Sequence, residues 1–267
     1  MKIAFVGCGV MGEAILKSLL AKGLVSPQEV TASDVSHSRC QLLSQRYGIT
    51  CGRDNRRAVD GAEVVILAIK PQNLGEVMAE LQGHLKPQQL VISIVASANL
   101  ADLTQGLSHN AVVRAMPNTP AQIGQGMTVW ASSSGLSQPH QETAKAILSS
   151  LGKELYISDE KYIDMSTAVS GSGPAYVFLF IEAFIDAAVH IGFSRQVASE
   201  LVLQTVLGSA QLAAESGKHP AELRNMVTSP GGVTAEGLLC LEKGGLRALL
   251  TQAVIKGYQK SGKLHHR

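Results

Sequence analysis

Residues 1–13 read Met1-Lys-Ile-Ala-Phe-Val-Gly-Cys-Gly-Val-Met-Gly-Glu13, and this stretch decides how the first half of the chain folds. The apolar run that ends at Val6 predicts a buried strand, and the periodic residues from Met11 to Lys22 predict the helix after it. The G-x-G-x-x-G pattern between them has the strand–turn–helix setting of a loop that holds a dinucleotide pyrophosphate. Glycine allows the tight turn, the approach of a ligand to the backbone, and close packing of helix on strand. The predicted contacts are Gly7, Gly9, Val10, Met11 and Gly12.

The same alternation continues through the first 160 residues, where short runs rich in Val and Ile are separated by amphipathic stretches. This rhythm is typical of βαβ units around a parallel sheet. We therefore predict an α/β fold with a Rossmann-type dinucleotide-binding domain over residues 1–160. The expected strands are Lys2–Val6, Glu29–Ser33, Val64–Ile69, Leu90–Val95, Val112–Ala115, Met127–Ala131 and Glu154–Ile157, and the expected helices are Met11–Lys22, Ser38–Tyr47, Asn73–Leu81 and Gln138–Leu151.

From residue 161 onward the strand pattern ends and long Ala- and Leu-rich runs with helical period begin. We predict an all-helical domain over residues 161–267. Its helices offer more apolar face than a small domain can bury alone, so at least a dimer is expected. The expected helices are Ala175–Ile191, Arg195–Ser216, Thr234–Lys243 and Leu246–Lys260.

The composition argues against several classes of function. A formal net charge of +2, with no basic block before the tail residues His265, His266 and Arg267, gives no electrostatic footprint for nucleic acid. The longest apolar stretch is interrupted by Glu182 and Asp186, short of the roughly 20 apolar residues of a membrane span. The 4 cysteines form no C-x-x-C pair, which fits a reduced cytoplasmic protein and indicates no metal site.

The segment after the second expected strand bears on which dinucleotide is bound. Asp34 lies at about the distance from Gly12 where an acid would bind the ribose hydroxyls of NAD. Ser33, Ser36 and Arg39 could instead bind the 2′-phosphate of NADP, because hydroxyls and guanidinium groups are good phosphate partners. Asp34 and Ser36 could also merely cap the next helix. The sequence leaves NADPH and NADH both open.

Other loops that follow sheet strands should line the same crevice. They supply five further candidate cofactor contacts, although a lysine in such a place is more often a surface residue and an asparagine more often forms a turn. These candidates are Asn55, Ala68, Lys70, Pro71 and Asn118.

Five motifs give the chain a resemblance to the Δ1-pyrroline-5-carboxylate reductases that spans nearly its whole length. The longest and most specific runs from His219 to Glu242 and contains Thr228-Ser-Pro-Gly-Gly-Val-Thr234. Ser170-Gly-Ser-Gly-Pro-Ala-Tyr176, Arg114-Ala-Met-Pro-Asn-Thr-Pro120 and Ala68-Ile-Lys-Pro71 follow the family's order and approximate spacing, together with the glycine-rich loop. The resemblance implies a Rossmann domain, a helical domain through which two subunits intertwine, and higher cyclic assembly in several members.

The resemblance also implies a substrate site in the loop from Ser229 to Thr234. Backbone N–H groups and the Ser229 hydroxyl would hold the substrate carboxylate, and the Thr234 hydroxyl would lie near the ring nitrogen. Pro-Gly-Gly before a helix does offer free N–H groups at the positive helix end, a natural carboxylate site. The same residues could form only a turn between helices, with Thr234 as its N-cap. The substrate contacts implied are Ser229, Gly231, Gly232, Val233 and Thr234, of which Thr234 is the catalytic candidate.

The activity implied is the NAD(P)H-dependent reduction of a cyclic imine to L-proline, the last step of proline biosynthesis. Two alternatives are a β-hydroxyacid dehydrogenase, which shares the glycine-rich start, and a non-catalytic NAD(P) sensor. The dehydrogenases need a lysine in the helix after Pro174, and the stretch from Ala175 to His190 contains none. The complete loop from Ser229 to Thr234 argues against a sensor.

Overall fold

The computed structural model describes residues 1–96 and 98–262, so the tail residues His265 and His266 lie outside it. The chain forms two compact units. One comprises Met1–Ser172 together with the segment from Gly257 onward, and the other comprises Gly173–Lys256.

An eight-stranded sheet in the order β3-β2-β1-β4-β5-β6-β7-β8 forms the centre of the first unit. Neighbouring strands run parallel except for β6 and β7, which are antiparallel. This topology confirms the predicted Rossmann-type α/β domain, while the reversal of β7 was not predicted. The strands are β1 Ile3–Val6, β2 Val30–Ser33, β3 Thr50–Gly52, β4 Val64–Leu67, β5 Leu90–Ser93, β6 Val112–Met116, β7 Gly126–Ser132 and β8 Gly152–Tyr156.

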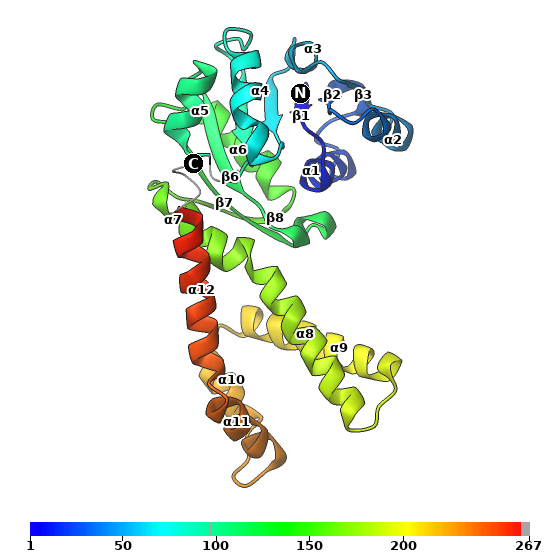
Figure 1. Cartoon of the computed structure of the whole chain (residues 1–267), viewed down its shortest axis with the longest axis vertical. Coiled ribbons are helices and arrows are strands. Elements are labelled where there is room, and N and C mark those ends of the chain that lie inside the picture. Colours follow the sequence, from blue (N-terminus) through cyan, green and yellow to red (C-terminus); the bar gives the residue numbers. More distant parts are fainter. Residues whose placement is uncertain (97, 263–267) are drawn as a thin grey trace. The chain divides into compact units, whose positions relative to one another are not determined.

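Alternating side chains on the buried strands supply two apolar cores, one on each face of the sheet. On β1, Ile3 and Phe5 join the core beneath α1 and α6, whereas Ala4 and Val6 join the core beneath α4 and α5. Figure 1 shows α4 and α5 on one side of the sheet and α6 on the other. Both faces of the parallel strands are therefore covered, as such sheets require. The helices of this unit are α1 Val10–Ala21, α2 His37–Tyr47, α3 Asn55–Val59, α4 Leu74–Leu81, α5 Leu100–Leu107, α6 Gln138–Ser149 and α7 Lys161–Ser166, with 3₁₀ turns η1 Pro27–Glu29, η2 Pro71–Asn73 and η3 Thr119–Ile123.

The first unit extends past the boundary predicted at residue 160, because α7 packs on the sheet. Ile163 is fully buried against Met116 and Val129. Arg114 of β6, 1% exposed, forms ion pairs of 2.7 Å with both Glu160 and Asp164. A π-helical turn, η4 Thr167–Gly171, follows α7 and leads to the point where the units divide.

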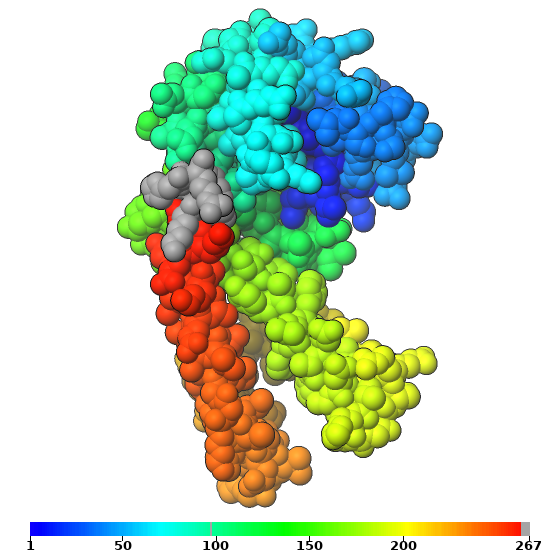
Figure 2. All heavy atoms as spheres, viewed as in Figure 1, coloured from blue at the N-terminus to red at the C-terminus, as the bar shows by residue number. Residues whose placement is uncertain are grey.

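The second unit consists of helices whose apolar side chains lie mostly at the surface. Figure 2 draws the atoms of these helices in yellow-green to red. Among its described residues only Ala198 and Val202 are buried apolar residues. Helix α8 is almost wholly apolar, and such a helix is usually buried. Its Phe178 and Leu179 side chains are nevertheless 61% and 63% exposed. One chain therefore leaves most of this apolar surface uncovered. The helices are α8 Gly173–His190, α9 Arg195–Ser216, α10 Pro220–Met226, α11 Val233–Lys243 and α12 Leu246–Gly262, whose last residues from Gly257 belong to the first unit.

Two helical stretches have the length and composition that a membrane span would need. They are Lys161–His190, in which α7, η4 and α8 are continuous, and Arg195–Ser216. The expectation that Glu182 and Asp186 rule out a span from composition was therefore too strong, because an 18-residue window of this stretch is apolar enough and contains at most two charged residues. Length and composition alone are weak evidence for a membrane, since helices that pack on other protein also satisfy them.

Candidate functional site

The glycine-rich loop joins β1 to α1, and its three glycines have different physical roles. Gly7 has a φ of +78°, and a Cβ there would lie 2.6 Å from Cγ2 of Ile69. A Cβ on Gly12 would lie 3.1 Å from the carbonyl oxygen of Gly7 and 3.2 Å from Cβ of Ala68. A Cβ on Gly9 would meet no described atom within 4 Å. Gly7 and Gly12 are thus needed for the fold of the loop, whereas Gly9 faces open space.

The amino end of α1 opens at this loop and can receive an anion. Gly9 is the N-cap residue, and no hydrogen bond from a described side chain caps the helix. The first described intrahelical bond runs from the N–H of Glu13 to the carbonyl of Gly9, so the N–H groups of Val10, Met11 and Gly12 are available to a ligand. Free N–H groups and the helix dipole favour a phosphate at such a position. The loop therefore fits the pyrophosphate of a dinucleotide.

The predicted ribose-side residues surround the loop, but most of their polar atoms are already engaged. Ser33 is fully buried, and its hydroxyl donates to Oδ1 of Asn55 at 2.7 Å. Asp34 accepts from the backbone N–H groups of Cys8 and Ser36, each at 3.0 Å. Ser36 is the N-cap of α2 and accepts from the N–H of Arg39. The buried Ser33 hydroxyl is thus not presented to a 2′-phosphate, and Asp34 and Ser36 do act as caps and loop supports.

Arg39 lies across the glycine-rich loop. Its Nε donates to the carbonyl of Cys8 at 2.8 Å and its Nη2 to the carbonyl of Gly9 at 3.2 Å. The same Nη2 forms an ion pair of 2.5 Å with Glu13. Glu13 also accepts hydrogen bonds from Arg46 at 2.9 Å and from the Tyr47 hydroxyl at 2.7 Å.

The electrostatics of this group hold Glu13 as a carboxylate. Partial burial acts to raise the pKa of Glu13, but the hydrogen bonds from Tyr47, Arg39 and Arg46 outweigh burial and hold the pKa below its usual value. Burial raises the pKa of the neighbouring Cys8 thiol to about 12, so this loop cysteine stays protonated near neutral pH.

The remaining predicted cofactor residues follow three different strands of the sheet, β3, β4 and β6. The Asn55 amide lies between Ser33 and Glu80, donating to Oε2 of Glu80 at 2.7 Å. Ala68 packs against the glycine-rich loop, while Lys70 and Pro71 are exposed at the end of β4, where η2 begins. Asn118 follows β6 and is 9% exposed. Its amide donates to the carbonyl of Ser170 and accepts from the N–H of Met127, so both of its polar ends bind protein.

The predicted substrate loop lies between α10 and α11 in the second unit. Gly231 has a φ of +66°, and Gly232 is the N-cap of α11 with no hydrogen bond from a described side chain. A Cβ on Gly232 would lie 2.3 Å from Oγ of Ser229, so glycine lets that hydroxyl lie against the backbone. Val233, 93% exposed, and Thr234 begin the helix at the surface. Thr234 is therefore inside the helix rather than its cap, and this helix end presents N–H groups to solvent.

Sequence reasoning missed the groups that support these loops. Glu13, Tyr47 and Glu80 are ordinary surface-type residues on helices, and their partners come from other elements. Only the buried Arg114 carried a signal, since a charged residue in an apolar strand must find a carboxylate. Among the described residues, no group of three or more His, Cys, Asp and Glu side chains is placed to hold a metal ion.

Comparison with known proteins identifies the family. A pyrroline-5-carboxylate reductase from Synechocystis sp. is 42% identical over 264 residues, which cover 99% of this chain and 98% of the relative. The chain belongs to the pyrroline-5-carboxylate reductase family. The Escherichia coli pyrroline-5-carboxylate reductase is 38% identical, with 98% of both chains covered.

Domain models and a solved structure of this family agree with the two units. The pyrroline-5-carboxylate reductase dimerisation model matches residues 160–264, and a model of NADP oxidoreductases described as coenzyme F420-dependent matches residues 2–97. The crystal structure of Plasmodium falciparum pyrroline carboxylate reductase with NADP bound has a TM-score of 0.91 and 31% identity, covering 99% of this chain and 98% of that one.

Proposed function

We infer that this chain reduces the C=N bond of Δ1-pyrroline-5-carboxylate to give L-proline, using a reduced nicotinamide dinucleotide. The observation that carries this inference is full-length membership of a reductase family by a chain that keeps both loops the reaction needs. One loop opens at the amino end of α1 and the other at the amino end of α11.

The first loop binds the cofactor. The N–H groups of Val10, Met11 and Gly12 hold the pyrophosphate, and Gly9 leaves room for it. Further contacts come from the segments that follow β3, β4 and β6, through side chains or backbone. They involve Asn55, Ala68, Lys70, Pro71 and Asn118. When bound, the reduced nicotinamide would supply a hydride to the imine carbon. The protein contributes by aligning the two rings, which is worth a large part of the rate.

The second loop binds the substrate. The exposed N–H groups of Val233 and Thr234, together with the turn at Gly231 and Gly232, receive the carboxylate, and the Ser229 hydroxyl adds a further hydrogen bond. The Thr234 hydroxyl polarises the ring nitrogen or delivers its proton. A protonated imine is already electrophilic, so one hydroxyl near the nitrogen suffices.

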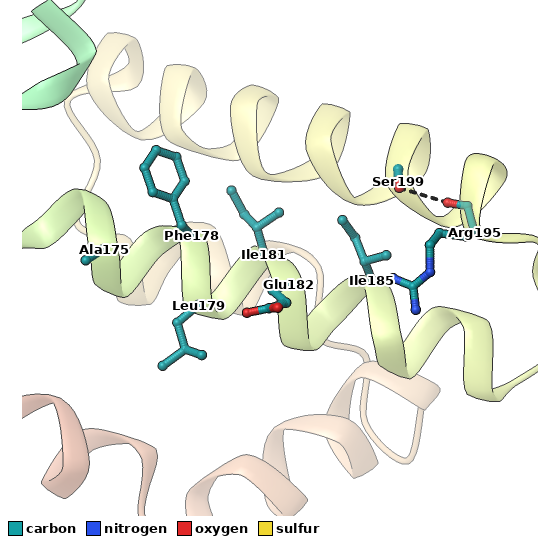
Figure 3. Close-up of a pocket in the computed structure, with 8 residues that line it drawn as sticks. All are labelled: Ala175, Phe178, Leu179, Ile181, Glu182, Ile185, Arg195 and Ser199. Carbon is teal, nitrogen blue, oxygen red and sulfur yellow. Dashed lines mark hydrogen bonds between the residues drawn. The ribbon is translucent and has the colours of Figure 1, made fainter. Parts of the chain in front are cut away.

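A second copy of the chain covers the apolar helices. A hollow of about 580 Å³ lies between α8 and α9 and is open to solvent in a single chain. Phe178, Ile181 and Ile185 are among the residues that line it (Figure 3). The match to a dimerisation domain over this segment supports a protein partner rather than lipid. The proposed assembly is a homodimer in the cytoplasm, which could itself build a larger ring. A chain that fractionates as a soluble dimer without detergent would support this, and one that needs detergent would contradict it.

NADPH is proposed to serve at least as well as NADH. Support comes from the Plasmodium falciparum relative, whose structure was solved with NADP bound. The buried Ser33 and the engaged Arg39 leave fewer groups for a 2′-phosphate than the sequence suggested.

The direct test follows the oxidation of NADPH and NADH at 340 nm with Δ1-pyrroline-5-carboxylate, with formation of L-proline measured separately. A 3-hydroxyacid with NADP⁺ or NAD⁺ tests the dehydrogenase alternative, which α8 makes unfavourable because it contains no lysine. Imine reduction with stoichiometric proline supports the proposal. Dinucleotide binding without turnover would indicate a sensor instead.

A further inference from the structure

We propose that Arg39 is a positioning residue that holds the glycine-rich loop in the shape a dinucleotide requires, and that it does not bind the 2′-phosphate of NADPH. This inference rests on the cofactor site proposed above. It concerns an arginine that the sequence offers as one candidate for phosphate binding.

The guanidinium of Arg39 is committed to the loop. Two of its nitrogens donate to consecutive backbone carbonyls, Nε to Cys8 at 2.8 Å and Nη2 to Gly9 at 3.2 Å. The carbonyl and the N–H of one trans peptide point in opposite directions, so holding the carbonyls of Cys8 and Gly9 orients the N–H groups of Gly9 and Val10. Fixing the carbonyls therefore fixes where the pyrophosphate donors point.

The backbone of Cys8 is held at both its N–H and its carbonyl. Its N–H donates to Oδ2 of Asp34 at 3.0 Å, while its carbonyl accepts from Arg39. Both partners come from the segment between β2 and the first turn of α2, so one short stretch supports the loop. Gly7 and Gly9 flank this peptide, and glycine gives a loop more freedom to lose on ordering than any other residue. Hydrogen bonds that hold the backbone therefore have the largest effect at such a place.

Glu13 keeps Arg39 in position. The ion pair of 2.5 Å uses Nη2, and Glu13 is itself fixed by Arg46 and Tyr47. The side chains of Arg39 and Glu13 are only 22% and 17% exposed. A phosphate would have to compete with a carboxylate already in contact, and moving the guanidinium toward it would release the two loop carbonyls.

Charge and geometry separate the two roles in experiment. Arg39→Lys keeps the positive charge that a 2′-phosphate would need, but an ammonium cannot reproduce the fork onto two carbonyls and a carboxylate. Arg39→Ala removes both the positive charge and these contacts. If Arg39 braces the loop, both variants should weaken NADPH and NADH binding by the same factor, about tenfold to a hundredfold, as for lost hydrogen bonds from a charged donor.

The measurements are dinucleotide affinity by calorimetry and backbone amide exchange over residues 7–13 without ligand. Exchange of this segment should become faster in both variants, while exchange in the strands β4 and β5 stays unchanged. Arg46→Ala is the matched control, because Arg46 binds the same Glu13 but no loop carbonyl. Because Arg39 and Tyr47 still hold Glu13 in this variant, it should change both affinities and the exchange of the loop much less than either Arg39 variant does.

Two outcomes would overturn the proposal. If Arg39→Ala weakens NADPH alone while Arg39→Lys retains most of its affinity, Arg39 is a phosphate ligand. If loop exchange and both affinities are unchanged, the contacts have no function. Because binding and exchange need no turnover, these outcomes are distinct from a failure to reduce the imine, which would count only against the proposed reaction.

Discussion

Gly9→Val separates the ligand-binding role of the loop from its folding role. The backbone of Gly9 has φ −66° and ψ −161°, which any residue can adopt, and a Cβ there meets no described atom within 4 Å. The folded protein should therefore accept valine at a cost of about 1 kcal/mol or less, mainly because valine is a poorer N-cap than glycine.

Cofactor binding should respond very differently. The valine side chain would fill the space through which the pyrophosphate reaches the backbone, and overpacking of this kind costs roughly 1–3 kcal/mol or more. That penalty corresponds to about a fivefold to more than a hundredfold loss of affinity. Calorimetric titration with NADPH measures it, and thermal unfolding of the free protein checks the fold.

Gly7→Ala is the contrasting variant. Alanine there must take a φ of +78° and place its Cβ 2.6 Å from Ile69. The backbone conformation costs about 1–2 kcal/mol and the close contact adds to it, so stability should fall clearly. A folded Gly9→Val protein with parental affinity, or equal destabilisation by the two substitutions, would refute the division of roles between these glycines.

Three further predictions test the substrate loop, the buried ion pairs and the response to acid. Thr234→Ala should mainly lower kcat and Ser229→Ala mainly raise KM, by about threefold to a hundredfold, in steady-state assays; a folded, dimeric Thr234→Ala enzyme with parental turnover would remove the catalytic role. Arg114→Met should lower the free energy of unfolding in urea by about 3 kcal/mol, which is the low end for a broken buried pair because the two carboxylates keep some contact with water. Lys161→Met breaks an exposed pair and should cause no measurable change. A similar loss of stability in both variants would count against the argument. The carboxylate of Glu13, whose pKa is lowered in the folded chain, contributes stability above the usual value of 4.5 and loses it as the pH falls through the folded pKa; the unfolding free energy of the parent should thus drop more between pH 7 and 3 than that of Glu13→Gln, and equal drops would disprove this.

The sequence predicted the elements that periodicity and glycine placement define. The strands at Ile3–Val6 and Val64–Leu67 are buried on both faces and read as continuous apolar runs. Helix α9 was predicted with its observed bounds, because Ser194 and Gly217 mark its two ends. Short elements were missed: β3 has three residues at the sheet edge, and α3 has five. Neither is long enough to show a period.

Strand direction and side-chain partners could not be read from the sequence. The run at Met127–Ala131 looks like any half-buried strand, and nothing in its pattern shows that it pairs antiparallel with β6. Arg39 is a good phosphate ligand by residue type, yet Glu13 lies 26 residues away in the sequence and decides where its guanidinium goes. Such choices are made by tertiary contacts rather than by local pattern.

The reversal of β7 sets the edge at which the chain leaves the sheet. Strands β1 to β6 end at the edge that carries the glycine-rich loop, whereas β7 and β8 run the opposite way, so β8 finishes at the far edge. The chain then returns across the sheet through α7, and the hydrogen bond from Asn118 to Ser170 ties this return to the end of β6. A chimera that grafts another helical domain onto this sheet would thus have to keep α7 and the contact between Asn118 and Ser170, because they bring the chain back to the edge where β6 ends.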